Sequence, residues 1–301
     1  MSGKIRVIFL RVSAGNFVIQ KQQNMKNILV TTDFSTHSKA GMRFAIQLAA
    51  QKNAELTFFY CFQALIPTTI HRSEIENSVQ QQTRTNLQKL EKFVAGVYKA
   101  MKATPGPYKC VVVEELSPES AILDYAHKNP VHYICIGTRG AGKVRKLIGT
   151  NTSSVILKSS VPVLAVPHTY RVRPVKKILY ASDLENLDEE MHLVAGFAKS
   201  AGVKSDLAHF YYPAELKLDH ETLTKMWQEK YPQLDRVFLE QFDVDAGFAK
   251  QLDRLIQKVK PGIVVFFTHT NKTWFDKIFS TSRSEAFSFI TKAPMLVYRK
   301  K

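Results

Sequence analysis

The stretch of sequence that decides the fold begins YICIGTRGAGKVRKLIGTNTSS over residues 133–154 and ends VPVLAV over residues 161–166. A short apolar run is followed by glycines, by four basic residues and by a Gly-Thr-Asn-Thr cluster that opens a second apolar segment. This order predicts a buried strand, a loop, and the N-terminus of a helix. Glycines suit a loop whose backbone must approach a ligand closely, because they accept positive φ and carry no side chain.

The loop and the helix start together predict an anion site. The first N–H groups of a helix are unpaired and lie at the positive end of its dipole, so they favour a phosphate. Four basic side chains add charge of the matching sign: Arg139, Lys143, Arg145 and Lys146. We interpret the site as one for a nucleotide, and a basic turn without a ligand is the alternative. A P-loop is disfavoured, since Gly137-x-x-x-x-Gly142-Lys143 has its spacing but Val144 stands where Ser or Thr would bind magnesium.

The composition is that of a soluble globular protein, with 301 residues that suffice for about two domains. No apolar run approaches the ~18 residues that cross a bilayer, and we expect a cytoplasmic protein without a membrane partner. The net charge of +16 attracts phosphates, nucleic acids and acidic surfaces without selecting among them. No aromatic-basic RNA signature accompanies that charge, so nucleic acid is not the expected partner.

The cysteines and histidines give no sign of a metal or redox centre. Cys61, Cys110 and Cys135 are far apart, odd in number and set in apolar runs. No pair has metal-ligand spacing, and a disulfide framework would look different. We expect reduced, buried thiols, and the nine scattered histidines support no metal site.

Strands alternate with helices along the first half of the chain. Strands are predicted at 27–32, 56–62, 110–113, 131–136 and 161–166, with helices after Ser35 and at 72–102, 117–127 and 152–159. This alternation predicts a parallel sheet covered by helices on both faces, with right-handed crossovers. Residues 1–25 are expected to be an N-terminal extension in poor order, and an added edge strand is the alternative.

The pattern then begins again, which indicates an internal duplication. Lys177–Asp183 lies 150 positions after Asn27–Asp33 and matches it in residue type. The further matches are a helix at 189–200, a strand at 206–211, a helix at 246–259, and strands at 263–267 and 293–297. Such a repeat predicts two like α/β domains, at 26–168 and 176–299, joined by a linker at 170–175.

With these motifs in view, the chain resembles the universal stress protein family in its tandem, two-domain form. The resemblance covers residues 26–298 and is carried by four motifs: Ile-Leu-Val-x-x-Asp-Phe-Ser at 28–35, Gly-Thr-Arg-Gly at 137–140, Gly-Thr-Asn-Thr at 149–152, and Val-Pro-Val-Leu-Ala-Val at 161–166. It implies doubly wound five-stranded sheets of order 3-2-1-4-5, a Rossmann-like fold of the adenine-nucleotide alpha-hydrolase type. It also implies that the fifth strands pair, so the two halves would form an intramolecular pseudo-dimer, with a homodimer as a further possibility.

The resemblance implies an ATP or other adenine-nucleotide site in the first domain, with magnesium accompanying the phosphates. Asp33 would face the adenosine, with Thr31 and Thr32 beside it, and a helix-capping role for Asp33 is the structural alternative. The glycines of the loop would approach the ribose and phosphates, and the following helix would supply phosphate contacts. The remaining implied residues are Ile136, Gly137, Arg139, Gly140, Gly149, Thr150, Asn151 and Thr152.

Two departures from the family pattern bear on the ligand. Eight residues separate Gly140 from Gly149, where ATP-binding members have nine, so the N–H groups of this loop point differently. In the second domain every glycine of the motif is gone and Glu185 replaces Ser35, so we expect that domain to be nucleotide-free.

The function that follows is a nucleotide-binding stress-response protein without strong catalysis. No base stands beside a nucleophile in the motifs, so ATP hydrolysis would be incidental. The alternatives are a nucleotide-free protein-interaction module of the same family, a weak ATPase or adenylate-transferring enzyme, and charge-driven binding of nucleic acid with steep salt dependence.

Overall fold

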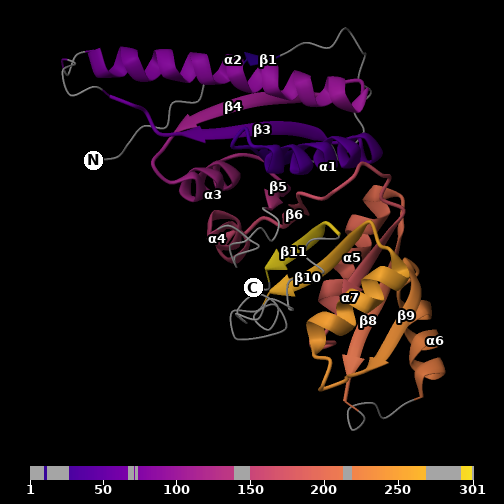
Figure 1. Ribbon diagram of the computed structural model, residues 1–301. Coiled ribbons are helices and arrows are strands. Elements are labelled where there is room, and N and C mark those ends of the chain that lie inside the picture. Colours follow the sequence, from indigo (N-terminus) through magenta and orange to yellow (C-terminus); the bar gives the residue numbers. More distant parts are fainter. Residues whose placement is uncertain are drawn as a thin grey trace.

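A computed structural model describes residues 10–11, 27–66, 71, 74–138, 150–212, 219–268 and 293–299. Its strands join into one continuous sheet with helices on both faces, and the two halves of the chain lie at the two ends of that sheet (Figure 1). Most of residues 1–26 and residues 139–149 and 269–292 lie outside the described residues.

The first half contains the predicted alternation. Its elements are β1 (Leu10–Arg11), β2 (Asn27–Thr31), α1 (Thr36–Lys52), β3 (Glu55–Phe62), α2 (Ile75–Met101), β4 (Tyr108–Glu114), α3 (Pro118–Lys128), β5 (Tyr133–Thr138), α4 (Thr150–Lys158) and β6 (Val163–Pro167). Caps explain two helix starts, since the side chains of Ser35 and Ser117 each accept a hydrogen bond from the N–H three residues later. β1 lies antiparallel to β4, at the edge of the sheet.

The second half repeats this order after an extended linker at residues 171–176. Its elements are β7 (Lys177–Ala181), α5 (Leu187–Ala201), β8 (Lys204–Tyr211), α6 (His220–Lys230), β9 (Leu234–Gln241), α7 (Phe248–Val259), β10 (Ile263–Thr268) and β11 (Met295–Arg299). Of these, α6 and β9 were not predicted from the sequence.

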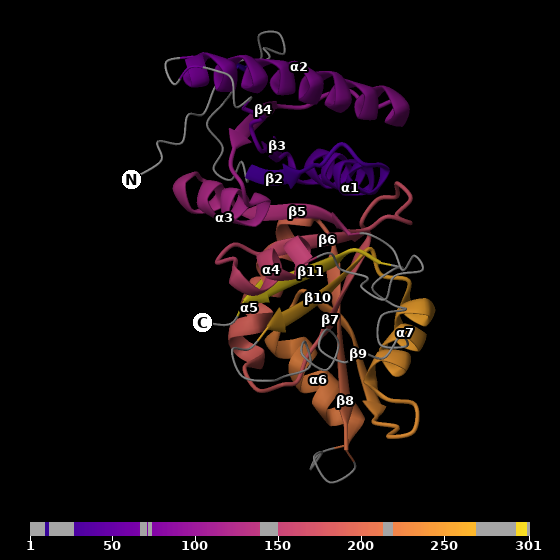
Figure 2. The same ribbon diagram turned by 60° about the vertical axis from the view of Figure 1, so that its left-hand side comes forward.

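The strand order is β1-β4-β3-β2-β5-β6-β11-β10-β7-β8-β9. Leaving out β1, each half has the order 3-2-1-4-5, and the pairs within each half are parallel. The predicted fold class is therefore confirmed. The halves meet through their fifth strands, β6 and β11, which pair antiparallel with Leu164 opposite Leu296. Figure 2 shows β6 and β11 side by side at the middle of the sheet.

The core has two layers, one on each face of the sheet, and each layer runs through both halves. One layer packs the strands against α1, α2, α5 and α6, and the other packs them against α3, α4 and α7. All five residues of β2 and of β6 are buried, which explains why these strands appear in the sequence as unbroken apolar runs. Because both layers are shared, the halves form one packed body.

Contacts away from the sheet tie the halves together further. The Gln51 side chain at the end of α1 accepts a hydrogen bond from Val175 N–H at 2.9 Å and donates one to Val175 C=O at 3.1 Å. The rings of Tyr133 on β5 and Phe197 on α5 meet edge to face at 5.5 Å. The linker is therefore fixed against the first half.

The three cysteines are free, as expected, but not all are fully buried. Cys110 and Cys135 are buried, whereas Cys61 is half-buried near the end of β3. The expectation of three buried thiols is wrong for Cys61, because this position faces a cavity.

Candidate functional site

The cavity of interest lies at the carboxyl ends of β2 and β5, where the strand order of the first half reverses. In doubly wound sheets this switch point opens a crevice in which ligands bind. The cavity has a volume of about 240 Å³. Its described lining is Thr31, Thr32, Asp33, Ser35, His37, Ser38, Phe59, Cys61, Pro118, Ile122, Ile136, Gly137 and Thr152.

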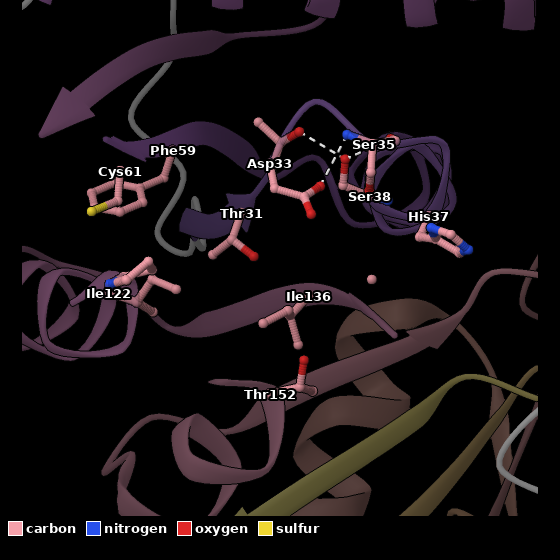
Figure 3. A pocket seen from close by; sticks show the side chains of 13 residues that line it. Thr31, Asp33, Ser35, His37, Ser38, Phe59, Cys61, Ile122, Ile136 and Thr152 are labelled. Atoms are coloured by element: carbon pink, nitrogen blue, oxygen red, sulfur yellow. Dashed lines mark hydrogen bonds between the residues drawn. The ribbon is translucent and has the colours of Figure 1, made fainter. Parts of the chain in front are cut away.

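The lining is apolar at one end and polar at the other. Figure 3 shows Phe59 and Cys61 of β3 with Ile122 of α3 at one end, and His37 of α1 at the other. Asp33 lies between them, and Thr152 of α4 stands on the opposite wall from α1. A molecule with a flat apolar part and a polar, charged part would match this division.

The turn after β2 gives the cavity its polar wall. Phe34 has φ of +61°, which is unusual for a bulky residue. The turn is held because Phe34 N–H donates to Thr32 Oγ1 at 3.0 Å and Ser35 N–H donates to Asp33 Oδ1 at 3.0 Å. Ser38 Oγ lies 2.8 Å from Thr32 Oγ1. The backbone N–H of Ser38 donates to Ser35 Oγ, so Ser35 caps α1. The hydroxyls of this wall are therefore engaged with one another and with the backbone.

The carboxylate of Asp33 is held in its charged form. Burial opposes ionisation, but hydrogen bonds from the side chain and N–H of Ser35, with the Ser38 side chain nearby, outweigh it, so the pKa of Asp33 lies below its ordinary value. The capping alternative for Asp33 is wrong, because Ser35 caps α1 and Asp33 instead accepts the Ser35 N–H within the turn.

Gly137 allows α1 to lie directly on β5. A Cβ at this position would come within 2.6 Å of the His37 carbonyl oxygen and 3.0 Å of Ser38 Cα. Gly41 faces it, since a Cβ there would lie 2.9 Å from Gly137 N. The predicted reason for Gly137 was close approach to a ligand, and the described residues give a different one, which is close approach of a helix.

The structure brings most of the described members of the predicted site together. Six of them line the cavity: Thr31, Thr32, Asp33, Ile136, Gly137 and Thr152. Thr150 and Asn151 are the first two residues of α4. Arg139, Gly140 and Gly149 lie outside the described residues.

Sequence reasoning missed the wall supplied by β3 and α3. Phe59 and Cys61 are two positions apart on β3, so they share a face of the sheet, and Phe59 pairs with Thr31 in register. That alternation was the available signal, but only the pairing of β2 with β3 shows which positions lie beside the cavity. Burial raises the pKa of the Cys61 thiol to about 11, with Glu115 and Glu114 adding to the effect.

The second half keeps the turn but changes the charge. Leu184 has φ of +66°, Leu184 N–H donates to Ser182 Oγ, and Glu185 N–H donates to Asp183 Oδ1 at 3.1 Å. The helix that follows differs, because the first turn of α5 carries three acids, Asp188, Glu189 and Glu190, whereas the first turn of α1 carries none. A helix start with three carboxylates is a poor place for a phosphate.

Searches for metal and membrane elements found nothing within the described part of the chain. No group of three or more His, Cys, Asp or Glu side chains there could hold a metal ion. None of the described helices combines the length and the apolar character that spanning a membrane demands.

Comparisons with known proteins agree with the fold. The model of the universal stress protein family matches residues 24–167. The universal stress protein in the QAH/OAS sulfhydrylase 3′ region of Thermus aquaticus is 28% identical over 142 residues, covering 47% of this chain and 98% of its own.

Two solved structures resemble both halves together. A universal stress protein from Archaeoglobus fulgidus DSM 4304 superposes with a TM-score of 0.65 at 15% identity, covering 92% of this chain and 99% of its own. A functionally unknown protein from Pseudomonas aeruginosa PAO1 gives a TM-score of 0.53 at 15% identity, covering 92% and 93%. At these identities the likeness extends to the fold.

Proposed function

Because the chain belongs to the universal stress protein family through its residues 24–167, we propose that its first half binds one adenine nucleotide and that this binding serves a regulatory role in the stress response. The site is the cavity between β2 and β5. The second half carries no nucleotide in this proposal.

One observation carries the proposal, which is the division of the cavity into an apolar and a polar end at the switch point of the sheet (Figure 3). The base would lie against Phe59, Cys61 and Ile122, and Asp33 would accept a hydrogen bond from the adenosine. The phosphates would extend toward the end of β5 and the start of α4, whose N–H groups favour an anion. Magnesium would then enter with the phosphates of ATP.

The volume of the cavity suits part of a nucleotide, with the rest of the ligand lying beyond the described lining. Small-molecule sites usually measure about 300–1,000 Å³, whereas this cavity measures about 240 Å³. A nucleoside would fill such a space, so the phosphates would contact the residues beyond Thr138. Those residues include Arg139, Gly140 and Gly149 of the predicted site.

The charge difference between the halves supports one nucleotide per chain. The first turn of α5 is acidic where that of α1 is not, and Glu185 takes the place of Ser35. The added carboxylates make the second position more negative than the first, which disfavours a triphosphate there.

The chemistry of the described lining favours binding over catalysis. A general base needs a pKa near the operating pH, and the pKa of Asp33 is lowered, because burial is outweighed by hydrogen bonds from Ser35 with the Ser38 side chain nearby. The Ser38 hydroxyl is occupied as well, since it donates to the Ser35 carbonyl oxygen at 2.9 Å. ATP hydrolysis would therefore be incidental.

A matched pair of variants tests the proposal by titration calorimetry with ATP and magnesium. Asp33→Ala and Asp183→Ala each remove the acceptor of an equivalent turn hydrogen bond, at 3.0 and 3.1 Å, so their structural costs should be similar. We expect one ATP per wild-type chain, at least tenfold weaker binding in Asp33→Ala, and unchanged binding in Asp183→Ala. Wild-type protein that takes up no ATP, or two, would refute the proposal.

A further inference from the structure

An imidazole at the polar end of the cavity has a second imidazole beside it. His37, the second residue of α1, lines the cavity and is half-buried. His168 directly follows β6 and is exposed. Their ring centroids are 5.6 Å apart with an interplanar angle of 54°, so one small anionic group could be contacted by both.

The backbone fixes where this pair lies. The His37 carbonyl oxygen lies against Gly137, since a Cβ added to that glycine would be only 2.6 Å from the oxygen. Thr138, the last residue of β5, pairs with Pro167, which precedes His168. His37 therefore lies beside the end of β5, at the opposite end of the cavity from Phe59 and Cys61 (Figure 3), and the ring contact places His168 next to it.

We infer that His37 and His168 are specificity-determining residues that bind the phosphate end of the nucleotide, so that the pocket selects nucleoside phosphates over nucleosides. This inference rests on the proposed function. Imidazolium N–H groups donate charge-assisted hydrogen bonds to phosphate oxygens. A phosphate beside a histidine favours its protonated form, so binding takes up protons near neutral pH.

Within the part of the chain that the structure describes, the charged groups nearest to His37 along the chain have partners of their own. The Asp33 carboxylate shares the cavity but accepts from Ser35, and Lys39 Nζ lies over the Phe93 ring at 5.1 Å. The thiol of Cys61 stays protonated near neutral pH because burial raises its pKa to about 11. Arg43 of α1 is close enough to Tyr170 to affect the pKa of that residue.

The second half lacks the pair, in keeping with its expected lack of nucleotide. The position 150 residues after His37 is Leu187, the first residue of α5. The acids of the α5 first turn follow it directly. An imidazole at this helix start is therefore present in the first half, where the first turn of α1 carries no acid, and absent from the start of α5.

The test compares ATP with adenosine by titration calorimetry at pH 7, in two buffers of different ionisation enthalpy, which gives the number of protons taken up. The variants are His37→Gln, His168→Gln and the double variant, and His127→Gln at the exposed end of α3 is the control. We expect about tenfold weaker ATP binding for each single variant, which corresponds to about 1.4 kcal/mol. Adenosine affinity should not change, and the proton uptake seen with ATP should vanish in the double variant.

The outcomes separate this inference from the proposal on which it rests. Wild-type protein that binds neither ATP nor adenosine would overturn both. ATP binding that keeps its affinity and its proton uptake in the double variant would overturn the inference alone, and so would an equal loss of ATP and adenosine affinity. Circular dichroism of each variant identifies any loss that comes from misfolding, and His37→Asn then replaces His37→Gln in the same comparison.

Discussion

Replacing Gly137 by alanine should destabilise the whole chain, because this glycine sets the distance between α1 and β5. The added Cβ would lie 2.6 Å from the His37 carbonyl oxygen, whereas ordinary contact begins at 3.4 Å, so the two must separate by 3.4 − 2.6 = 0.8 Å. The obstacle is backbone in the first turn of α1 and cannot rotate away. Overpacking of this kind costs about 1–3 kcal/mol, and a contact with backbone belongs at the upper end.

A smaller gain offsets part of that cost. Removing a glycine restricts the unfolded chain and stabilises the fold by about 0.4–1 kcal/mol where the new residue fits. We therefore expect a net loss of about 2 kcal/mol in the free energy of unfolding for Gly137→Ala. Gly96→Ala is the matched control, since a Cβ at this exposed position in α2 meets nothing within 4 Å. The control should gain about 0.5–1 kcal/mol.

Urea unfolding, followed by circular dichroism and by tryptophan fluorescence, measures the loss of stability and shows whether it extends to both halves. Circular dichroism reports the whole chain, while both tryptophans, Trp227 and Trp274, lie in the second half. Because the core layers run through both halves, Gly137→Ala should shift the fluorescence and dichroism midpoints together. A variant as stable as wild type would refute the packing argument. A fluorescence transition that does not move would refute the single core.

Two further predictions concern the linker and the cavity thiol. Gln51→Ala should cost about 2 kcal/mol of unfolding free energy in urea titrations, because the Val175 N–H and C=O lose their partners at 2.9 and 3.1 Å; an unchanged midpoint would show that water replaces them. Burial raises the pKa of Cys61 to about 11 from an ordinary value of 9.0, so the thiol should react slowly with iodoacetamide at pH 8. The unfolded thiol ionises first, so Cys61 should also lower stability as pH rises from about 9 to about 11, and Cys61→Ala should flatten that part of the curve.

Much of the fold could be predicted because its strands are buried on both faces. Runs such as Ile28–Val30 and Val163–Val166 are apolar throughout, and similar runs at 178–180 and 295–298 marked the second half. The elements that were not predicted, α6 and β9, have no such buried apolar run. β9 is an edge strand with the mixed sequence LDRVFLEQ, and only Leu223 and Trp227 of α6 are buried.

The sequence predicted the site residues that belong to local motifs, but not those that strand pairing and helix packing bring in from elsewhere in the chain. The turn at Thr31–Asp33 and the end of β5 are local motifs, so their residues could be named in advance. The walls from β3, α3 and the first turn of α1 depend on which strands pair and on how closely α1 approaches Gly137. His168 is a further case, since nothing in its own neighbourhood in the sequence relates it to His37.

The antiparallel pairing of β6 with β11 has a consequence for communication through the protein. This pairing reverses the strand direction of the second half. The carboxyl ends of β2 and β5 therefore lie at one edge of the sheet, and those of β7 and β10 lie at the opposite edge. A ligand at one edge could not contact a ligand at the other, and the paired strands β6 and β11, with Leu164 opposite Leu296, connect the two halves. Each edge can therefore hold its own ligand, and any coupling between the two would pass through the continuous sheet and the contacts of Gln51 with Val175 and of Tyr133 with Phe197.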